Sequence, residues 1–489
     1  MAKSQQQFAD NKVDLKGDDD DDDDINNLES ITLVEGGPNL LLREKQPLVS
    51  NQTSHRDEVA KCDDKHLSGV LVHSESRTIS GHWVWKRLED IRNSFHHVIL
   101  GTKLNCLLLC IPVAMFMVHA DYGKGWIFAF SLLGMLPLAE RLGFVTEQLS
   151  YFTGPTVGGL LNATFGNATE IIICVFALKD DMIRVVQLSL LGSILSNMLL
   201  VLGCAFFFGG LVHSNDQKFN KGTAQVSSGL LLMAVMGLLF PAVLHATHTE
   251  LKYGASELSL SRFSSIIMLA AYSSFIYFQL RSGKERSNDA DEEQGDRGFL
   301  RPNSCVLTFW DSIFWLTALT IFISVLSQYL VDAINGASAA WNVPLPFISV
   351  IVLPIVGNAA EHASAIMFAL KDKLDISLGV AIGSSTQISM FVIPFCVIIG
   401  WPMGTRMDLN FQLFETGTLF ITVLVVAFML QEGTANYFKG LMLVLCYLIV
   451  GASFFVHSDS LDPHCTWDLK VGDRRSLWMQ LPETLEVSL

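Results

Sequence analysis

The sequence predicts an all-α polytopic membrane protein with about eleven transmembrane helices, arranged as one extra N-terminal helix and two inverted five-helix repeats. Three observations support this prediction. Hydrophobic residues make up 50% of the chain and charged residues 17%. The mean hydropathy is +0.39 although the first hundred residues are polar, so the rest of the chain is apolar enough to cross a bilayer. One short polar motif also occurs twice, in two apolar segments.

Residues 1–100 form the first segment, for which we expect a disordered, acidic tail in the cytosol. Seven consecutive aspartates run from Asp18 to Asp24, and they repel one another and cannot contribute to a hydrophobic core. The formal net charge of −15 comes largely from such acidic blocks, so nucleic acid is not an expected partner. We expect the remaining chain to lie in the lipid bilayer.

Eleven apolar stretches predict the transmembrane helices. The first lies in segment 101–120 and has no counterpart later in the chain. Five follow in segment 121–280 and five in segment 305–456, and an acidic linker at 281–304 separates the two groups. Because five is odd, the second group enters the membrane in the opposite sense from the first. The predicted spans are 104–119, 125–145, 156–178, 183–208, 226–246, 261–280, 311–333, 346–370, 376–400, 412–430 and 436–456.

Lysine and arginine residues near the ends of these spans indicate the orientation. With a cytosolic N-terminus, fifteen of them lie on the cytosolic side and six lie in the short loops of the other side. An excess of positive charge on the cytosolic side is the usual arrangement in membrane proteins. We therefore expect the N-terminus and the linker in the cytosol, and the short C-terminal tail, 457–489, on the lumenal side.

The repeated motif is a five-residue sequence that ends in glutamate. Its copies are Gly166-Asn167-Ala168-Thr169-Glu170 and, 191 positions later, Gly357-Asn358-Ala359-Ala360-Glu361. Each copy places an acid inside an apolar segment, where an ionisable side chain costs about 2.5–3.5 kcal/mol. A buried acid is a costly way to hold helices together, so the motif is poorly explained by helix packing alone. Two matching acids in two repeats predict one shared site near the bilayer midplane.

Neutral oxygen atoms are expected to complete this site. The glycine four residues before each glutamate, Gly166 or Gly357, lies on the same helix face and leaves a gap beside the carboxylate. Hydroxyl and amide groups occur in both motifs and in the span after each, namely Asn167, Asn358, Ser193, Ser196, Asn197, Ser384, Ser385, Thr386 and Gln387. Oxygen-only ligands suit hard cations such as Ca²⁺ and, to a lesser degree, Mn²⁺. For any single serine or asparagine, a hydrogen bond between helices is the alternative.

Two facing carboxylates, on Glu170 and Glu361, balance the charge of one divalent cation. Without the cation, two anions in a medium of low dielectric constant repel each other and are expected to take up protons. The same groups then bind either a divalent cation or protons, which is what an exchanger requires. Glu147, toward the end of the second span, is a further candidate for proton coupling, with a position at the membrane interface as the alternative.

Other polar residues fit a function less well. Two interpretations are open for a cluster of acidic residues in the linker: a regulatory, cation-sensing segment or simply a solvated linker. The cluster consists of Asp289, Asp291, Glu292, Glu293 and Asp296. Hydrogen-bonded packing is the alternative to a functional role for His362, next to Glu361. His245, His248 and Glu250 lie near the end of a span. Their residue types are the only feature that suggests a metal site there. The sequence contains no Cys-x-x-Cys pair and no His-Glu-x-x-His motif, so we expect neither a cofactor nor enzymatic activity.

Four motifs together resemble the signature repeats of the vacuolar cation/proton exchanger family, within the Ca²⁺/cation antiporter superfamily. They lie at 166–170, 192–197, 357–362 and 383–387, and the resemblance covers about 100–456. It implies Ca²⁺/H⁺ antiport into an acidic organelle such as the vacuole, with Glu170 and Glu361 as the acids that bind cation and proton. Cys204-Ala205-Phe206 resembles a tripeptide associated with Mn²⁺ transport in some plant members, with apolar packing as the alternative.

Three other functions stay open at this stage. The first is a divalent cation exchanger driven by Na⁺ or K⁺, although the site offers no evident second cation pocket. The second is an intramembrane hydrolase that uses the two glutamates as a carboxylate pair, although no nucleophile–base arrangement supports it. The third is a passive Ca²⁺ channel. Assembly into a homo-oligomer is also left open.

Overall fold

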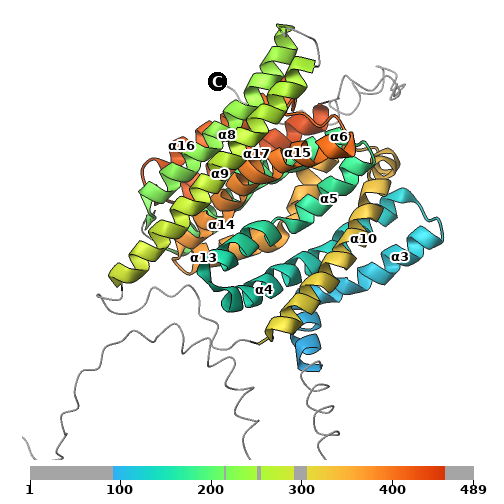
Figure 1. Cartoon of the computed structure of the whole chain (residues 1–489), viewed down its shortest axis with the longest axis horizontal. Coiled ribbons are helices and arrows are strands. Elements are labelled where there is room, and N and C mark those ends of the chain that lie inside the picture. The colour runs from blue at the N-terminus through green and yellow to red at the C-terminus, as the bar shows by residue number, and fades with distance from the viewer. Residues whose placement is uncertain (1–91, 214–215, 250–254, 291–305, 458–489) are drawn as a thin grey trace, which may run out of the picture. The chain divides into compact units, whose positions relative to one another are not determined.

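The computed structural model describes residues 92–213, 216–249, 255–290 and 306–457, which all lie in one compact unit, 62–489. Helices make up nearly all of this described part (Figure 1). Its strands are two residues long each, β1 (Gln217–Lys218) and β2 (Thr434–Ala435), and they pair antiparallel. The predicted all-α class is therefore confirmed.

The first half of the described chain follows the predicted order of spans. Its elements are η1 (Lys103–Leu109), α3 (Cys110–His119), α4 (Lys124–Phe165), α5 (Ala168–Lys179), α6 (Ile183–Leu195), η2 (Ser196–Val201), α7 (Leu202–Val212), α8 (Lys221–Thr247) and α9 (Ala255–Ala290). Asn220 caps α8, because its side chain accepts a hydrogen bond from the backbone N–H of Thr223.

The second half repeats this order from α12 onward. Its elements are α10 (Phe309–Trp341), α11 (Leu345–Phe347), η3 (Ile348–Val352), α12 (Leu353–Gly357), α13 (Ala359–Leu370), α14 (Leu374–Gln387), η4 (Ile388–Val392), α15 (Ile393–Met403), α16 (Leu413–Leu430) and α17 (Tyr437–Val456). The loops after α5 and α13 also match, because Asp181 and Asp372, 191 positions apart, both have a left-handed backbone with φ near 58° and 57°.

The number of spans stays a prediction. Within the described residues, eight helices are long and apolar enough to cross a membrane, or up to ten if each of two bent helix pairs is one span. One bent pair is Arg92–Ile99 with Lys103–His119, at 94°, and the other contains α12 and α13, at 58°. The predicted span 156–178 is divided between the end of α4 and α5, because α4 continues beyond the predicted end of the second span.

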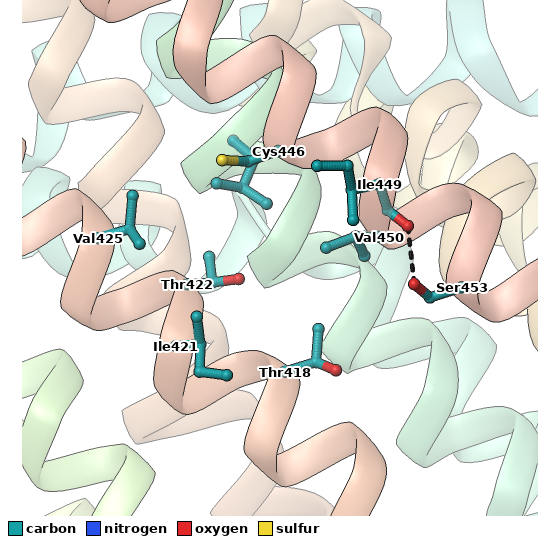
Figure 2. A pocket seen from close by; sticks show the side chains of 9 residues that line it. Thr418, Ile421, Thr422, Val425, Cys446, Ile449, Val450 and Ser453 are labelled. Atoms are coloured by element: carbon teal, nitrogen blue, oxygen red, sulfur yellow. Dashed lines mark hydrogen bonds between the residues drawn. The ribbon is translucent and has the colours of Figure 1, made fainter. Parts of the chain in front are cut away.

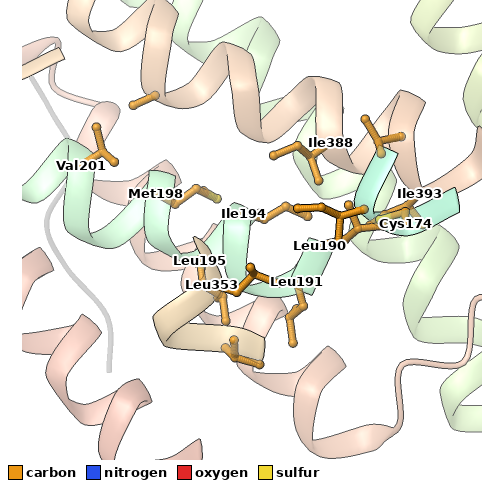
Figure 3. Close-up of a cluster of buried hydrophobic side chains, with 14 of the residues drawn as sticks. Cys174, Leu190, Leu191, Ile194, Leu195, Met198, Val201, Leu353, Ile388 and Ile393 are labelled. Atoms are coloured by element: carbon orange, nitrogen blue, oxygen red, sulfur yellow. The ribbon is translucent and has the colours of Figure 1, made fainter. Parts of the chain in front are cut away.

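Helices from the two halves pack against one another. α4 lies along α10, α7 along α17, and α8 along α16, and the first of these pairs is visible in Figure 1. α6 lies in the interior, where Leu190, Leu191, Ile194 and Leu195 belong to a cluster of buried apolar side chains (Figure 3). The outer helices expose large apolar side chains such as Phe263 and Phe314, which suits contact with lipid.

Gly192 allows α6 to approach η3 closely. A Cβ added at this position would overlap the backbone of Val350 and the side chain of Pro354. The repeat-related Gly383 has nothing within 4 Å of such a Cβ. The first of the two glycines is therefore required by packing between the halves.

Three short segments have π-helical geometry, η2, η3 and η4. η2 follows α6 and η4 follows α14, at matching positions of the two repeats. A π-turn inside an α-helix is rare and is frequent at functional sites. Here η2 begins at Ser196, and η4 begins directly after Gln387.

Candidate functional site

Both copies of the repeated motif interrupt a helix. α4 ends at Phe165 and α5 begins at Ala168, so the backbone leaves helical geometry at Asn167, with φ −109° and ψ 22°. The second copy does the same at Asn358, with φ −100° and ψ 14°. The bend at 357–358 is 58°. The glycine of each motif left open a close approach of helices or a bend beside the acid, and the structure has a break in the helix in both repeats.

Each glutamate lies in the first turn of the helix that follows the break. Glu170 is in the first turn of α5 and Glu361 in the first turn of α13. The first turn of a helix has unpaired backbone N–H groups and a partial positive charge, which stabilise a nearby carboxylate. The two carboxylates are also close enough to each other for electrostatic repulsion. The structure therefore brings together the two acids that the sequence singled out.

A chain of hydrogen bonds connects the two halves beside these acids. The side-chain amide of Asn167 donates to Gln387 over 2.6 Å, and the hydroxyl of Ser384 donates to the Asn167 oxygen over 3.5 Å. The amide of Asn197 in turn donates to Ser384 over 3.0 Å. The side chains of Ser384 and Asn197 also reach Glu361. Two residues from each half thus form one network.

A small cavity of about 20 Å³ lies at Glu170. Its lining combines both halves, with Ser193 from α6 and with Gly357 and Asn358 from the second motif. The remaining lining residues are Thr169, Ile173, Ser189, Leu353 and Pro354. A space of this size accepts a single water molecule or a bare metal ion.

Three buried polar atoms at this place have no hydrogen-bond partner among the described residues. They are Oδ1 of Asn197, Nδ2 of Asn358 and Oε2 of Glu361. Buried polar atoms are normally paired, so each unpaired one needs an explanation. Two of the three are acceptors, and a cation would satisfy them; a half-turn of the Asn358 amide would add a third oxygen.

The ligands of such a cation would include amides and hydroxyls as well as the two acids. In the described part of the chain, no group of three or more His, Cys, Asp and Glu side chains could hold a metal ion. His245 pairs with Glu257 over 3.0 Å, and Glu250 lies outside the described residues. The oxygen-only set predicted from the sequence is consistent with this composition.

Other predicted site residues lie in different surroundings. Ser196 is hydrogen-bonded to Nε2 of His362 over 3.2 Å, which places this histidine in contact with η2. The hydroxyl of Ser385 donates to Ala381 inside its own helix, and Gly166 is exposed. Glu147 is exposed on α4 and accepts a hydrogen bond from Tyr151 over 3.2 Å.

The predicted regulatory linker is outside the description of the structure. Asp289 belongs to the last residues of α9, but its side chain is not described. Asp291, Glu292, Glu293 and Asp296 lie outside the described residues. The regulatory role of this segment stays a prediction.

Sequence reasoning missed two polar residues that line the cavity, Thr169 and Ser189. Ser189 lies four residues before Ser193, so the two hydroxyls share one face of α6. That spacing is the signal that identifies Ser189. Thr169 stands inside the repeated motif, where the second copy has Ala360.

A larger cavity of about 220 Å³ lies between α16 and α17 (Figure 2). Its lining is mainly apolar, with Ile421, Val425, Ile449 and Val450, and contains no acidic residue. The hydroxyl of Ser453 donates to the backbone of Ile449 instead of pointing a free oxygen at a ligand. This cavity therefore lacks the carboxylates that would balance the charge of a divalent cation.

Comparison with known proteins identifies relatives over most of the chain. The family model described as "Sodium/calcium exchanger protein" matches residues 123–281 and 311–456. Vacuolar cation/proton exchanger 2 of Oryza sativa subsp. japonica is 61% identical over 434 residues, which are 88% of this chain and 96% of that protein. Vacuolar cation/proton exchanger 5 of Arabidopsis thaliana is 66% identical over 378 residues, which are 77% and 85% of the two chains.

Solved structures agree with this relationship. Native YfkE superposes with a TM-score of 0.61 at 35% sequence identity, over 72% of this chain and all of that one (100%). The H⁺/Ca²⁺ exchanger CAX has a TM-score of 0.54 at 12% identity, over 72% and 91% of the two chains, which shows a shared fold. The chain thus belongs to the sodium/calcium exchanger family and, within it, to the vacuolar cation/proton exchangers, as the paired motifs predict.

Proposed function

We propose that this protein is a secondary antiporter that moves Ca²⁺ from the cytosol into the vacuole, or another acidic organelle, in exchange for H⁺. The observation that carries the proposal is the meeting of Glu170 and Glu361, each beside a helix break, in one network of oxygen ligands. The most similar relatives named above are cation/proton exchangers. YfkE, 35% identical, is named a Ca²⁺/H⁺ antiporter.

The electrostatics of the site support exchange of one cargo for the other. Two carboxylates neutralise one Ca²⁺, and amide and hydroxyl oxygens from Asn197, Ser193 and Asn358 complete its coordination. When Ca²⁺ leaves, Glu170 and Glu361 face each other across a medium of low dielectric constant, where two negative charges cannot both persist at low cost. Protons then replace the metal ion. Binding of one cargo thus requires release of the other.

The arrangement of the helices supports alternating access. The acids belong to two oppositely inserted repeats and lie at breaks in their helices, as substrate sites do in transporters built from inverted repeats. A rocking movement of one repeat against the other would expose the same site first to one side and then to the other. The lysine and arginine distribution supports a cytosolic N-terminus. In that orientation, protons leaving the acidic lumen would drive Ca²⁺ from the cytosol into the lumen.

Mn²⁺ is a second cargo that the site would accept, because it also prefers oxygen ligands. The tripeptide Cys204-Ala205-Phe206 is a weaker argument for Mn²⁺. It lies in α7, where Ala205 and Phe206 are buried and Phe206 stacks on Phe219. These apolar contacts support the alternative that the tripeptide serves helix packing.

The test is uptake of ⁴⁵Ca²⁺ by the full chain reconstituted into sealed vesicles with an acidic interior and no Na⁺ or K⁺. We expect uptake that collapses when the pH gradient is removed, competition by Mn²⁺, and loss of uptake in Glu170→Gln and in Glu361→Gln. Glu432→Gln is the matched control, because Glu432 is an exposed acid in a loop. Uptake that survives both site substitutions would refute the two-glutamate site. Uptake that appears only after Na⁺ or K⁺ is added would mean that one of these ions, and not the proton, drives transport.

A further inference from the structure

The segment 404–412, between α15 and α16, docks against helices of the first half. Met407, Leu409 and Phe411 alternate with polar residues and are fully buried. The backbone N–H of Leu409 donates to the hydroxyl of Ser261 on α9 over 3.0 Å. The hydroxyl of Thr405 donates to the carbonyl of Leu178 at the end of α5 over 3.3 Å. This segment therefore connects the two halves at one end of the helices.

Asp408 joins the segment to α6. Its Oδ1 accepts a hydrogen bond from Nε2 of Gln187 over 3.1 Å and another from the backbone N–H of Asn410, also over 3.1 Å. Gln187 donates in addition to the backbone carbonyl of Asn410 over 3.1 Å. Gln187 is 2% exposed, and Asp408 and Asn410 are half-buried, so these bonds are partly shielded from solvent.

A second carboxylate faces Asp408 from α9. Glu257 is 4% exposed, and its negative charge repels that of Asp408. One of its oxygens is 3.0 Å from Nδ1 of His245 on α8. The other, Oε1, is buried and has no hydrogen-bond partner in the described part of the chain. A buried acid and a half-buried acid thus interact at a place that lies outside the exchange site.

The remaining charged groups around Asp408 have closer partners. Arg184, on α6, is 2.6 Å from Glu415 of α16, and His457 after α17 lies 3.7 Å from the same carboxylate. Arg262 of α9 stacks over the ring of Trp401, 4.3 Å from its centre. His245 attenuates the repulsion from Glu257, because it favours the charged form of Asp408.

Burial raises the pKa of the Asp408 carboxyl from 3.8 to about 6, and the charge of Glu257 adds to this effect. The hydrogen bonds from Asn410 and Gln187 oppose it. The docked segment therefore holds a proton more tightly than an undocked segment would. Docking is therefore most favourable at low pH and weakens as the pH rises from about 4 to about 6, where Asp408 becomes charged.

The repeat-related segment of the first half lacks this property. Asp216 and Phe219 precede Asp408 and Phe411 by 192 positions, and Phe219 is buried as Phe411 is. The segment docks through Gln217, which donates to the carbonyl of Ala369 and to Asp372. Asp216, however, is exposed. The two docking contacts therefore differ in the surroundings of one aspartate.

We propose that Asp408 and Glu257 form a proton-binding site, separate from the exchange site, and that a proton held there keeps segment 404–412 docked on α6 and α9. The lumenal position of this site rests on the proposed function and its orientation of the protein in the membrane. The docking contact itself is independent of that orientation. In that orientation the acidic lumen supplies the proton. The exchanger would then keep its halves connected at the lumenal end while the lumen is acidic.

The test is hydrogen exchange of the backbone amides of 404–412, measured by mass spectrometry on the full chain in nanodiscs with EGTA and corrected for intrinsic exchange rates. From pH 3.5 to 7.5 we expect protection to fall by a factor of up to about 100, because two pKa units correspond to about 100-fold in the docking equilibrium. The midpoint of this fall should lie between the ordinary pKa of Asp408, 3.8, and the raised value of about 6. Protection that does not change with pH would overturn the proposal.

Three variants sharpen this experiment. Asp408→Asn keeps the acceptor for Gln187 without the charge, so the segment should stay protected at both pH values. Glu257→Gln removes the facing charge, so the midpoint should move to lower pH. Asp216→Asn, in the repeat-related segment, is the matched control and should leave the response of 404–412 unchanged. A wild-type response in both Asp408→Asn and Glu257→Gln would also overturn the proposal.

The exchange measurement needs neither Ca²⁺ nor a gradient, so its outcome is independent of transport. Glu361→Gln protein should lose Ca²⁺ uptake and keep the pH response of 404–412. Loss of the response together with normal uptake would refute only the proton-binding site. A normal response without any proton-driven uptake in the wild type would refute only the proposed function.

Discussion

The side-chain amide of Asn167 donates a hydrogen bond of 2.6 Å to Gln387, 220 positions away in the sequence. This bond joins the helix break of the first motif to the end of α14 in the second half. It also fixes the orientation of the Asn167 amide, whose oxygen accepts from Ser384. The side chains that one half contributes to the proposed site are thus held in place by the other half.

Replacing Gln387 by leucine should weaken Ca²⁺ transport. The change leaves the buried amide of Asn167 without its acceptor, which costs about 1–3 kcal/mol, and frees it to rotate. We expect the KM for Ca²⁺ in vesicle uptake to rise about tenfold. Gln431→Leu, at an exposed glutamine, is the control and should behave as wild type. An unchanged KM in Gln387→Leu would separate this hydrogen bond from cation binding.

Gly192→Ala should destabilise the protein. The added methyl group meets the backbone of Val350, which cannot move aside as a flexible side chain would, and overpacking of this kind costs about 1–3 kcal/mol. A lower melting temperature in detergent, followed by circular dichroism, measures the effect. Gly379→Ala on α14 is the control, since nothing lies within 4 Å of the new methyl group. Equal melting temperatures for the two variants would contradict the close approach of α6 and η3.

Asp408→Asn should stabilise the protein in a pH-dependent way. The pKa of Asp408 is raised from 3.8 to about 6 in the folded protein, so the wild type loses stability as the pH rises between these values, whereas the asparagine variant does not. The difference is up to about 3 kcal/mol above pH 6 and vanishes near pH 3. Melting temperatures of both proteins between pH 4 and 8 measure it. A constant difference across this range would show that the charge of Asp408 is not its cause.

Arg184→Met should be strongly destabilising. Glu415 is fully buried and lies 2.6 Å from Arg184, and removing one partner of a buried ion pair costs about 3–5 kcal/mol. The double variant Arg184→Met/Glu415→Leu should recover most of the lost melting temperature, because no uncompensated charge remains. Lys439→Met is the control, since its partner Glu432 is exposed and little change is expected. No recovery in the double variant would mean that Arg184 acts through contacts other than Glu415.

The repeated motifs made the meeting of the two acids in the proposed site predictable. Glu170 and Glu361 stand out because acids are rare in apolar segments, and repetition indicates that they belong to one site. The glycine of each motif permits either a close approach of helices or a bend, and only the structure shows the break at Asn167 and Asn358. Contacts such as Asp408 with Gln187 have no local signal, because their partners are more than 200 positions apart. The π-turn at Ser196 has no signal either, since its residues are ordinary for a transmembrane helix.

The packing of α4 along α10, α7 along α17 and α8 along α16 has a consequence for how the protein is made. Neither half has a complete interior, because the inward faces of its helices pack against helices of the other half. The first half can therefore complete its packing only after α17, near the end of the chain, has been synthesised. A ribosome that stops at 281–304 would leave a product whose inward faces meet only lipid.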